Sequence, residues 1–139
     1  MNTKRRIGET KSTGFQVGAR RTFSVPPEHA WKVLTSPRGT TLWLGPGSPP
    51  RFAAGERYRL ADGSEGEVRV VSDSHLRLTW RPATWEGAST VQVRVIPRGA
   101  GTVVAFHQEH LPGPAEREER KSFYAAALDG LERMLGSRD

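Results

Sequence analysis

Three side chains that commonly bind metals or transfer protons lie close together near the end of the sequence. His107 and Glu109 would share one face of an extended strand, while His110 would point to the other face. A third ligand would then have to come from elsewhere, and nothing in the sequence places His29 or His75 nearby. The helical HExxH spacing of zinc hydrolases is also absent. We therefore predict no metal site and place His107 and Glu109 on a polar outer face.

The motifs of the common nucleophilic and nucleotide-dependent enzymes are missing. The chain has no GxSxG elbow, no Walker-type glycine-rich loop and no GxGxxG. It has no cysteine, which excludes thiolate chemistry and disulfides. The paired carboxylates Glu65 and Glu67 indicate a solvated strand face, and Glu116 could pair with Arg120 one helical turn later. We predict no catalytic residue and no cofactor.

Aromatic and apolar side chains offer a different chemistry, the binding of an apolar guest. Gln108 has the same strand parity as Phe106, so its amide would face the interior and need a partner there. That partner is either a ligand or a backbone group at the strand end. Tyr124 could orient a guest through its hydroxyl. The predicted ligand-binding residues are Trp43, Tyr58, Trp80, Phe106, Gln108, Tyr124 and Leu128.

A long amphipathic helix that begins at Pro114 would form one wall of this site. Tyr124, Leu128, Leu131 and Leu135 lie on one of its faces, because helical neighbours are three or four residues apart. One helix, about 10 to 12 Å thick, cannot cover a sheet of five or six strands spaced about 4.8 Å apart. We therefore predict an under-filled interior between the helix and the sheet.

The stretch from Phe52 to Leu111 has the period-two alternation of strands. Short turn sequences, Asp62–Gly63, Ser72–Ser74 and Arg98–Gly101, separate the segments, so the connections are hairpins and the sheet is antiparallel. The longer loop from Pro82 to Ala88 carries Trp85 and could form a rim or lid.

The region before this sheet predicts one more strand and two short helices. Alternation from Phe15 to Val25 indicates the strand, in which Arg21 interrupts the apolar face. Arg21 would lie at a cavity mouth or mark a bulge. Pro27 starts one helix, and Ser36 caps a second helix.

Composition is consistent with one domain. The chain has 139 residues, 35% of them hydrophobic and 26% charged. This length is sufficient for a hydrophobic core that does not need disulfides or metal ions to stabilise it. We place a basic arm at residues 1–14, with Lys4, Arg5 and Arg6, and a single domain at 15–136. Of the net charge of +6, +5 falls within residues 1–21, which disfavours nucleic acid as a partner. No segment approaches the ~18 apolar residues of a membrane span, and we expect a cytoplasmic protein.

Several short segments of the chain resemble those of a known family. The chain resembles the START-like, Bet v 1-like helix-grip superfamily (SRPBCC), in the branch of activator of Hsp90 ATPase homologues. The segments are Arg21 to Trp31 (RTFSVPPEHAW), Gly66 to Val68 (GEV), Leu76 to Trp80 (LRLTW), Gly101 to His107 (GTVVAFH) and Tyr124 to Leu135 (YAAALDGLERML). Members commonly have tryptophan at the position of Tyr124. The resemblance implies a hydrophobic cavity for lipids, polyketides or similar molecules, and in some members a cyclase or aromatase activity.

The expected architecture is therefore an α+β helix-grip fold. It has a curved antiparallel sheet of about six strands, two short helices after the first strand, and a long C-terminal helix over the concave face. The expected function is binding of a small apolar or aromatic molecule without catalysis. One alternative is a cyclase-type enzyme in which Tyr124, Gln108, Arg21 or Arg81 polarises a carbonyl. The other is a module that docks on a protein partner through a sheet face or the basic arm. The oligomeric state stays open.

Overall fold

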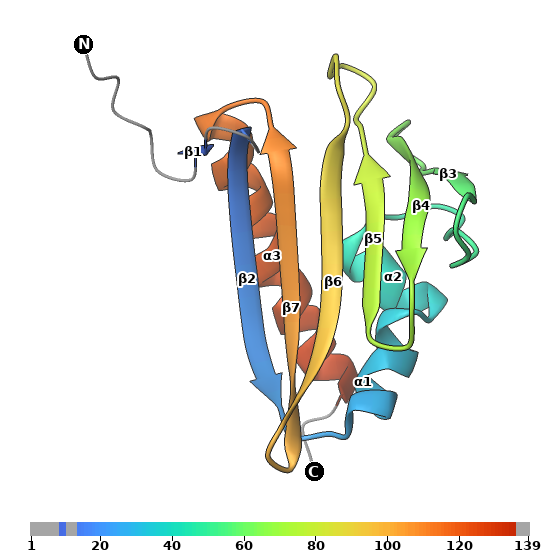
Figure 1. Cartoon of the computed structure of the whole chain (residues 1–139), viewed down its shortest axis with the longest axis vertical. Helices are drawn as coiled ribbons and strands as arrows, with labels where there is room; N and C mark the ends of the chain where they lie inside the picture. The colour runs from blue at the N-terminus through green and yellow to red at the C-terminus, as the bar shows by residue number, and fades with distance from the viewer. Residues whose placement is uncertain (1–8, 11–13, 136–139) are drawn as a thin grey trace.

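A single antiparallel sheet with helices on one face forms the domain (Figure 1). The computed structural model describes residues 9–10 and 14–135. Most of the predicted basic arm, with Lys4, Arg5 and Arg6, lies outside the described residues. The strand order is β1-β2-β7-β6-β5-β4-β3. The strands are β1 (Glu9–Thr10), β2 (Gly14–Phe23), β3 (Arg57–Arg59), β4 (Glu65–Val71), β5 (His75–Trp80), β6 (Ser89–Arg98) and β7 (Gly101–Leu111), and the helices are α1 (Pro27–Leu34), α2 (Pro37–Trp43) and α3 (Pro114–Leu135).

The start and turn signals of the sequence produce these elements locally. The Ser36 hydroxyl accepts a hydrogen bond from the Gly39 N–H at 3.1 Å, which caps α2. The Asp62 carboxylate accepts one from the Ser64 N–H at 2.9 Å in the turn between β3 and β4. This hydrogen bond also lowers the pKa of Asp62. The predicted helix-grip fold, with six main strands and the two-residue β1 at one edge, is confirmed.

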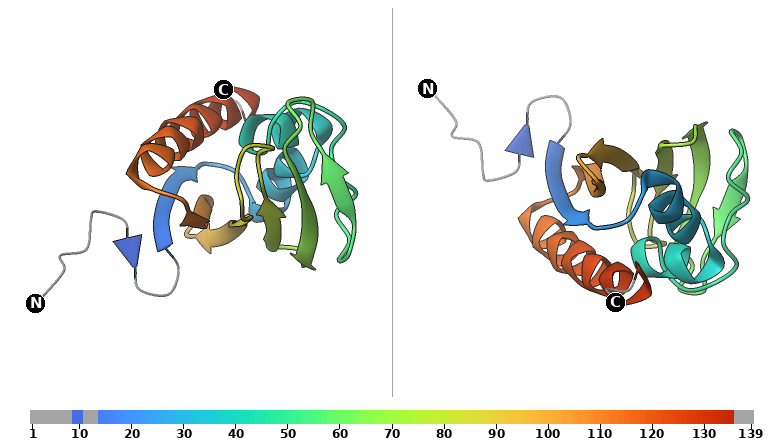
Figure 2. Two further views of the ribbon diagram at one scale, coloured as in Figure 1. Left: turned by 90° about the horizontal axis from the view of Figure 1, so that it is seen from above. Right: turned by 90° about the horizontal axis from the view of Figure 1, so that it is seen from below.

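Three helices, not one, cover the concave face of the sheet. Figure 2 shows α1 and α2 on the same side of the sheet as α3. Ala30 and Leu34 of α1 and Trp43 of α2 are fully buried. The uncovered area of the sheet is therefore smaller than α3 alone would leave.

Arg21 fastens β2 to α3. Its Nη1 atom lies 2.9 Å from a carboxylate oxygen of Asp129 and 3.0 Å from one of Glu132. The hydrogen bond to Asp129 is the largest cause of a raised Arg21 pKa. The bulge of β2 lies elsewhere, between Phe15 and Val17. The interruption at Arg21 is therefore not a bulge, and its side chain forms an ion pair between strand and helix.

The first turns of α3 are also tied to β2. The Nε of Arg117 donates a hydrogen bond to the backbone carbonyl of Gln16 at 2.8 Å.

Of the helices in the described part of the chain, none combines the length and the apolar character needed to cross a bilayer.

Gly66 offers a test of how tightly β3, β4 and β5 pack. A Cβ atom at Gly66 would lie 1.9 Å from the backbone oxygen of Thr79 and 2.6 Å from the Tyr58 hydroxyl. We expect Gly66→Ala to lower the free energy of unfolding by about 3 kcal/mol, because backbone atoms must move. Gly87→Ala, where a Cβ meets nothing within 4 Å, should change it by less than about 0.5 kcal/mol. Urea denaturation of both variants measures this, and equal effects would contradict the packing described.

Candidate functional site

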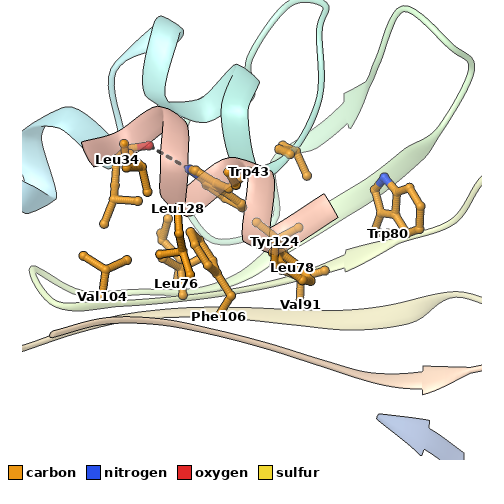
Figure 3. Close-up of a cluster of buried hydrophobic side chains, with 14 of the residues drawn as sticks. Leu34, Trp43, Leu76, Leu78, Trp80, Val91, Val104, Phe106, Tyr124 and Leu128 are labelled. Carbon is orange, nitrogen blue, oxygen red and sulfur yellow. Dashed lines mark hydrogen bonds between the residues drawn. The ribbon is translucent and has the colours of Figure 1, made fainter. Parts of the chain in front are cut away.

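A column of stacked rings fills the centre of the interior. The ring of Phe106 lies 5.1 Å from that of Tyr124 and 6.3 Å from that of Trp43, centroid to centroid. All three side chains are almost fully buried, and the Trp43 Nε1 donates to the Leu34 carbonyl at 2.9 Å (Figure 3). The rings expected to line a void therefore contact one another, and Leu128 packs in the same cluster. Their contact with a ligand stays a prediction.

A buried polar cluster lies beside these rings. The Gln108 carbonyl oxygen accepts hydrogen bonds from the Tyr124 hydroxyl at 2.8 Å and from the Arg120 Nε at 2.9 Å. The Gln108 amide donates to the Ser89 hydroxyl at 2.8 Å, which in turn donates to the Trp80 carbonyl at 2.8 Å. Gln108 thus faces inward, as its strand parity predicts, but its partners are side chains and not a backbone group. The cluster joins β5, β6, β7 and α3.

Arg120 is the functional candidate that sequence reasoning missed. Its predicted pairing with Glu116 is wrong, because the side chain turns into the interior and is only 5% exposed. Its guanidinium carbon lies 4.0 Å from the ring centroid of Trp80 and 4.1 Å from that of Phe123. Arg120 is four residues before Tyr124, so it lies on the apolar stripe of α3. That position was the signal available in the sequence.

No described carboxylate forms an ion pair with Arg120 within 4.0 Å. The Arg120 charge acts on Asp62 at longer range and, after the hydrogen bonds from Ser64, helps to lower the pKa of that carboxyl. Three neighbouring rings supply cation–π attraction, and Gln108 accepts one hydrogen bond. Because desolvating an ion costs several kcal/mol, a buried cation without a counter-ion in contact is unusual.

Trp80 and Trp85 form the edge of this cluster. Trp80 is 6% exposed, and its ring contacts Trp85 edge-on at 5.3 Å between centroids. Trp85 is half-buried on the loop between β5 and β6, and the loop is held by a hydrogen bond from the Arg81 guanidinium to the Trp85 carbonyl. Trp85 therefore covers Trp80, as expected of a rim residue.

Among the described residues, Tyr58 makes no hydrogen bond to the polar cluster, although Tyr124 and Arg120 act on it electrostatically. Its hydroxyl donates to the Thr79 carbonyl, and burial raises its pKa. Tyr58 also lines an open surface groove of about 490 Å³ whose walls include Arg57, Arg59 and Arg81. A second open pocket, of about 520 Å³, lies between α2 and α3. Tyr58 is thus a core residue that borders a charged surface, and its contact with a ligand stays a prediction.

The histidines near the end of β7 lie at its outer face. His107 Nε2 is 2.9 Å from the Gln16 side-chain oxygen, and Glu109 lies 3.5 Å from His110. His110 has a φ of 65°, at the bulge opposite Gln16. In the described ranges, no three histidine or acidic side chains are grouped so that they could hold a metal ion.

Comparison with known families identifies the domain. The model of the family described as activator of Hsp90 ATPase homolog 1-like protein matches residues 24–136. The chain belongs to this family. The match covers every helix of this family member and all strands from β3 to β7. Among curated proteins, no sequence matches the chain significantly.

Solved structures share the fold. CalU16 from Micromonospora echinospora is 19% identical with a TM-score of 0.73, over 88% of this chain and 76% of that chain. Protein MLL2253 from Mesorhizobium loti is 26% identical with a TM-score of 0.73, over 89% of this chain and 98% of the other. PFC0360w, an HSP90 activator from Plasmodium falciparum, is 20% identical with a TM-score of 0.68, over 87% and 96%. At these identities the likeness of CalU16 and PFC0360w concerns the fold.

Substitutions of Gln108 and Arg120 test which members of the polar cluster stabilise the fold. Gln108→Leu leaves the Tyr124 hydroxyl and the Arg120 Nε without an acceptor, so we expect a loss of about 2 kcal/mol or more. Arg120→Met keeps an apolar stem against Trp80 and removes a charge without a counter-ion in contact, so it should stay within about 1 kcal/mol of the wild type. Chemical denaturation of both variants measures this. A larger loss in Arg120→Met would show that the cation itself stabilises the fold.

The buried phenol of Tyr124 makes the free energy of unfolding depend on pH in the alkaline range. Burial raises the pKa of Tyr124, so the folded state keeps the phenol proton at a pH where the unfolded chain, with a pKa of about 10, loses it. The contribution to stability is therefore complete below about pH 10 and declines above it. We expect the free energy of unfolding to fall less steeply with pH in Tyr124→Phe than in the wild type. Denaturation curves from about pH 8 to pH 11 test this, and parallel slopes would contradict it.

Proposed function

We propose that this domain binds a small apolar or aromatic molecule in the interior between α3 and the sheet. The observation that carries the proposal is the cluster of Gln108, Tyr124 and Arg120 inside an aromatic core. Ligand sites combine mostly apolar walls with a few converging polar groups that fix orientation. The cluster has this composition, and it is buried among Trp80, Phe106 and Phe123.

The energetics of the cluster support a role beyond folding. An apolar core of the same volume would avoid the desolvation of Arg120, and such replacements are often neutral or stabilising. Side chains that are unfavourable for stability are found where function requires them. The helix-grip fold alone does not determine a function, so the cluster is the feature that supports this one.

Access is proposed to occur where Trp85 covers Trp80. The loop of residues 81–88 crosses the end of β5, and its Trp85 ring is only half-buried. By contrast, Arg117 and Arg21 attach α3 to β2 at the opposite side. Displacement of the Trp85 ring would expose Trp80 and the guanidinium beneath it without separating α3 from the sheet.

The two alternatives lack a comparable observation. A cyclase-type reaction would need a polarising group. Of its four candidates, Arg21 and Arg81 are held in ion pairs with carboxylates, and the other two, Tyr124 and Gln108, are hydrogen-bonded to each other. A chaperone-type docking role is suggested by the family description and by PFC0360w, whose 20% identity carries the fold alone.

Native mass spectrometry of freshly purified protein tests the proposal. We expect a bound small molecule to be retained and to be identifiable after extraction. A Tyr124→Ala variant would lose about 3 to 5 kcal/mol of core packing, since Tyr124 is fully buried, so it would confound binding with folding. Tyr124→Phe instead removes only the hydroxyl, and it should retain the fold while holding less of the guest.

Trp85→Ala provides the matched kinetic control. It removes the ring over Trp80 and should speed uptake and release of the guest while leaving the polar cluster intact. A wild-type protein that retains no small molecule, yet co-purifies with a protein, would favour docking. Chemical turnover of the guest would favour the enzyme.

A further inference from the structure

The edge of the polar cluster contains hydrogen-bond donors that the protein itself does not use. The indole Nε1–H of Trp80 is buried and has no hydrogen-bond partner. The guanidinium carbon of Arg120 lies 4.0 Å from the centroid of the same ring. A buried donor without an acceptor is rare in folded proteins, and each such group needs an explanation.

The Arg120 guanidinium also has more N–H donors than its protein partners use. Its Nε–H is taken by the Gln108 oxygen at 2.9 Å, and one terminal nitrogen reaches the Tyr124 hydroxyl at 3.4 Å. A guanidinium carries five N–H groups, so most of them remain for another acceptor. Gln108 fixes the position of the group and does not neutralise it.

The missing partner is therefore an acceptor that carries negative charge. The described acidic side chains form no ion pair with Arg120 within 4.0 Å. A carboxylate has two oxygens that can accept from a guanidinium in parallel, and a third donor such as an indole N–H can share one of them. The single positive charge of Arg120 neutralises the single negative charge of a carboxylate. A phosphate would bring more charge into this apolar surrounding than Arg120 compensates.

The surroundings define the rest of the ligand. Phe123 lies 4.1 Å from the guanidinium carbon, and Trp85 contacts Trp80 edge-on. Both rings are half-buried, and the Trp85 ring occupies the position that an incoming aromatic group would take against Trp80. Figure 3 shows Trp80 at one side of the Trp43–Phe106–Tyr124 column, away from α2.

From this arrangement we infer that the ligand is an apolar or aromatic monocarboxylate, bound through its carboxylate by the Arg120 guanidinium and the Trp80 indole N–H. This inference rests on the proposed function and adds the chemical class of the ligand. The polar end of the molecule lies deepest, and its apolar end lies against Phe123 and the loop of residues 81–88.

Cinnamate and its neutral analogue cinnamamide test the inference, because they have nearly the same shape and differ in charge. Isothermal titration calorimetry on the full chain should show cinnamate binding at least about tenfold more tightly, which equals about 1.4 kcal/mol. Arg120→Met should reduce the ratio to near one while cinnamamide binding persists. Trp80→Phe keeps the ring and should reduce the ratio by about fivefold.

Arg77→Met is the control, since Arg77 is an exposed arginine on the same strand as Trp80. It should leave the preference for the acid unchanged. Equal binding of acid and amide, or a preference that survives Arg120→Met, would overturn the carboxylate assignment and leave small-molecule binding in place. Binding of neither compound up to its solubility, together with no retained molecule in native mass spectrometry, would overturn both proposals.

Discussion

The interior of this domain is organised around one hydrogen-bond acceptor, the side-chain oxygen of Gln108. It holds the Tyr124 hydroxyl and the Arg120 Nε at once, and the amide of the same residue reaches Ser89. Through these contacts β6, β7 and α3 share one buried network. Because a partly satisfied buried network is worse than an apolar core, the position of each member restricts the others. The orientation of the guanidinium toward Trp80 follows from this restriction.

Much of the fold could be predicted because its signals are local. The cap at Ser36, the turn at Asp62 and the alternation in β5 and β6 each depend on a few neighbouring residues. Antiparallel pairing then follows from the short connections. Contacts between distant segments are not encoded in this way. Arg21 bonds to residues 108 and 111 positions away, and no local pattern encodes such a partner.

The candidate site was predictable in part for the same reason. Strand parity placed Gln108 in the interior and helical spacing placed Tyr124 on the apolar face of the last helix, but neither pattern shows which groups meet there. Arg120 was assigned to the surface because a charged residue near Glu116 on a helix is usually solvated. Its burial depends on the rings of Trp80 and Phe123, which come from different parts of the chain. The covering of the sheet by α1 and α2 is a tertiary property, which no local pattern reveals.

The attachment of α3 to β2 has a mechanical consequence. Arg117 bonds to Gln16 near one end of the helix, and Arg21 bonds to Asp129 and Glu132 toward the other. Both contacts lie along the same strand, so together they define an axis about which α3 could rotate. A widening of the domain that kept both contacts would therefore tilt α3 about the line of β2 and open the side of the domain that faces away from β2.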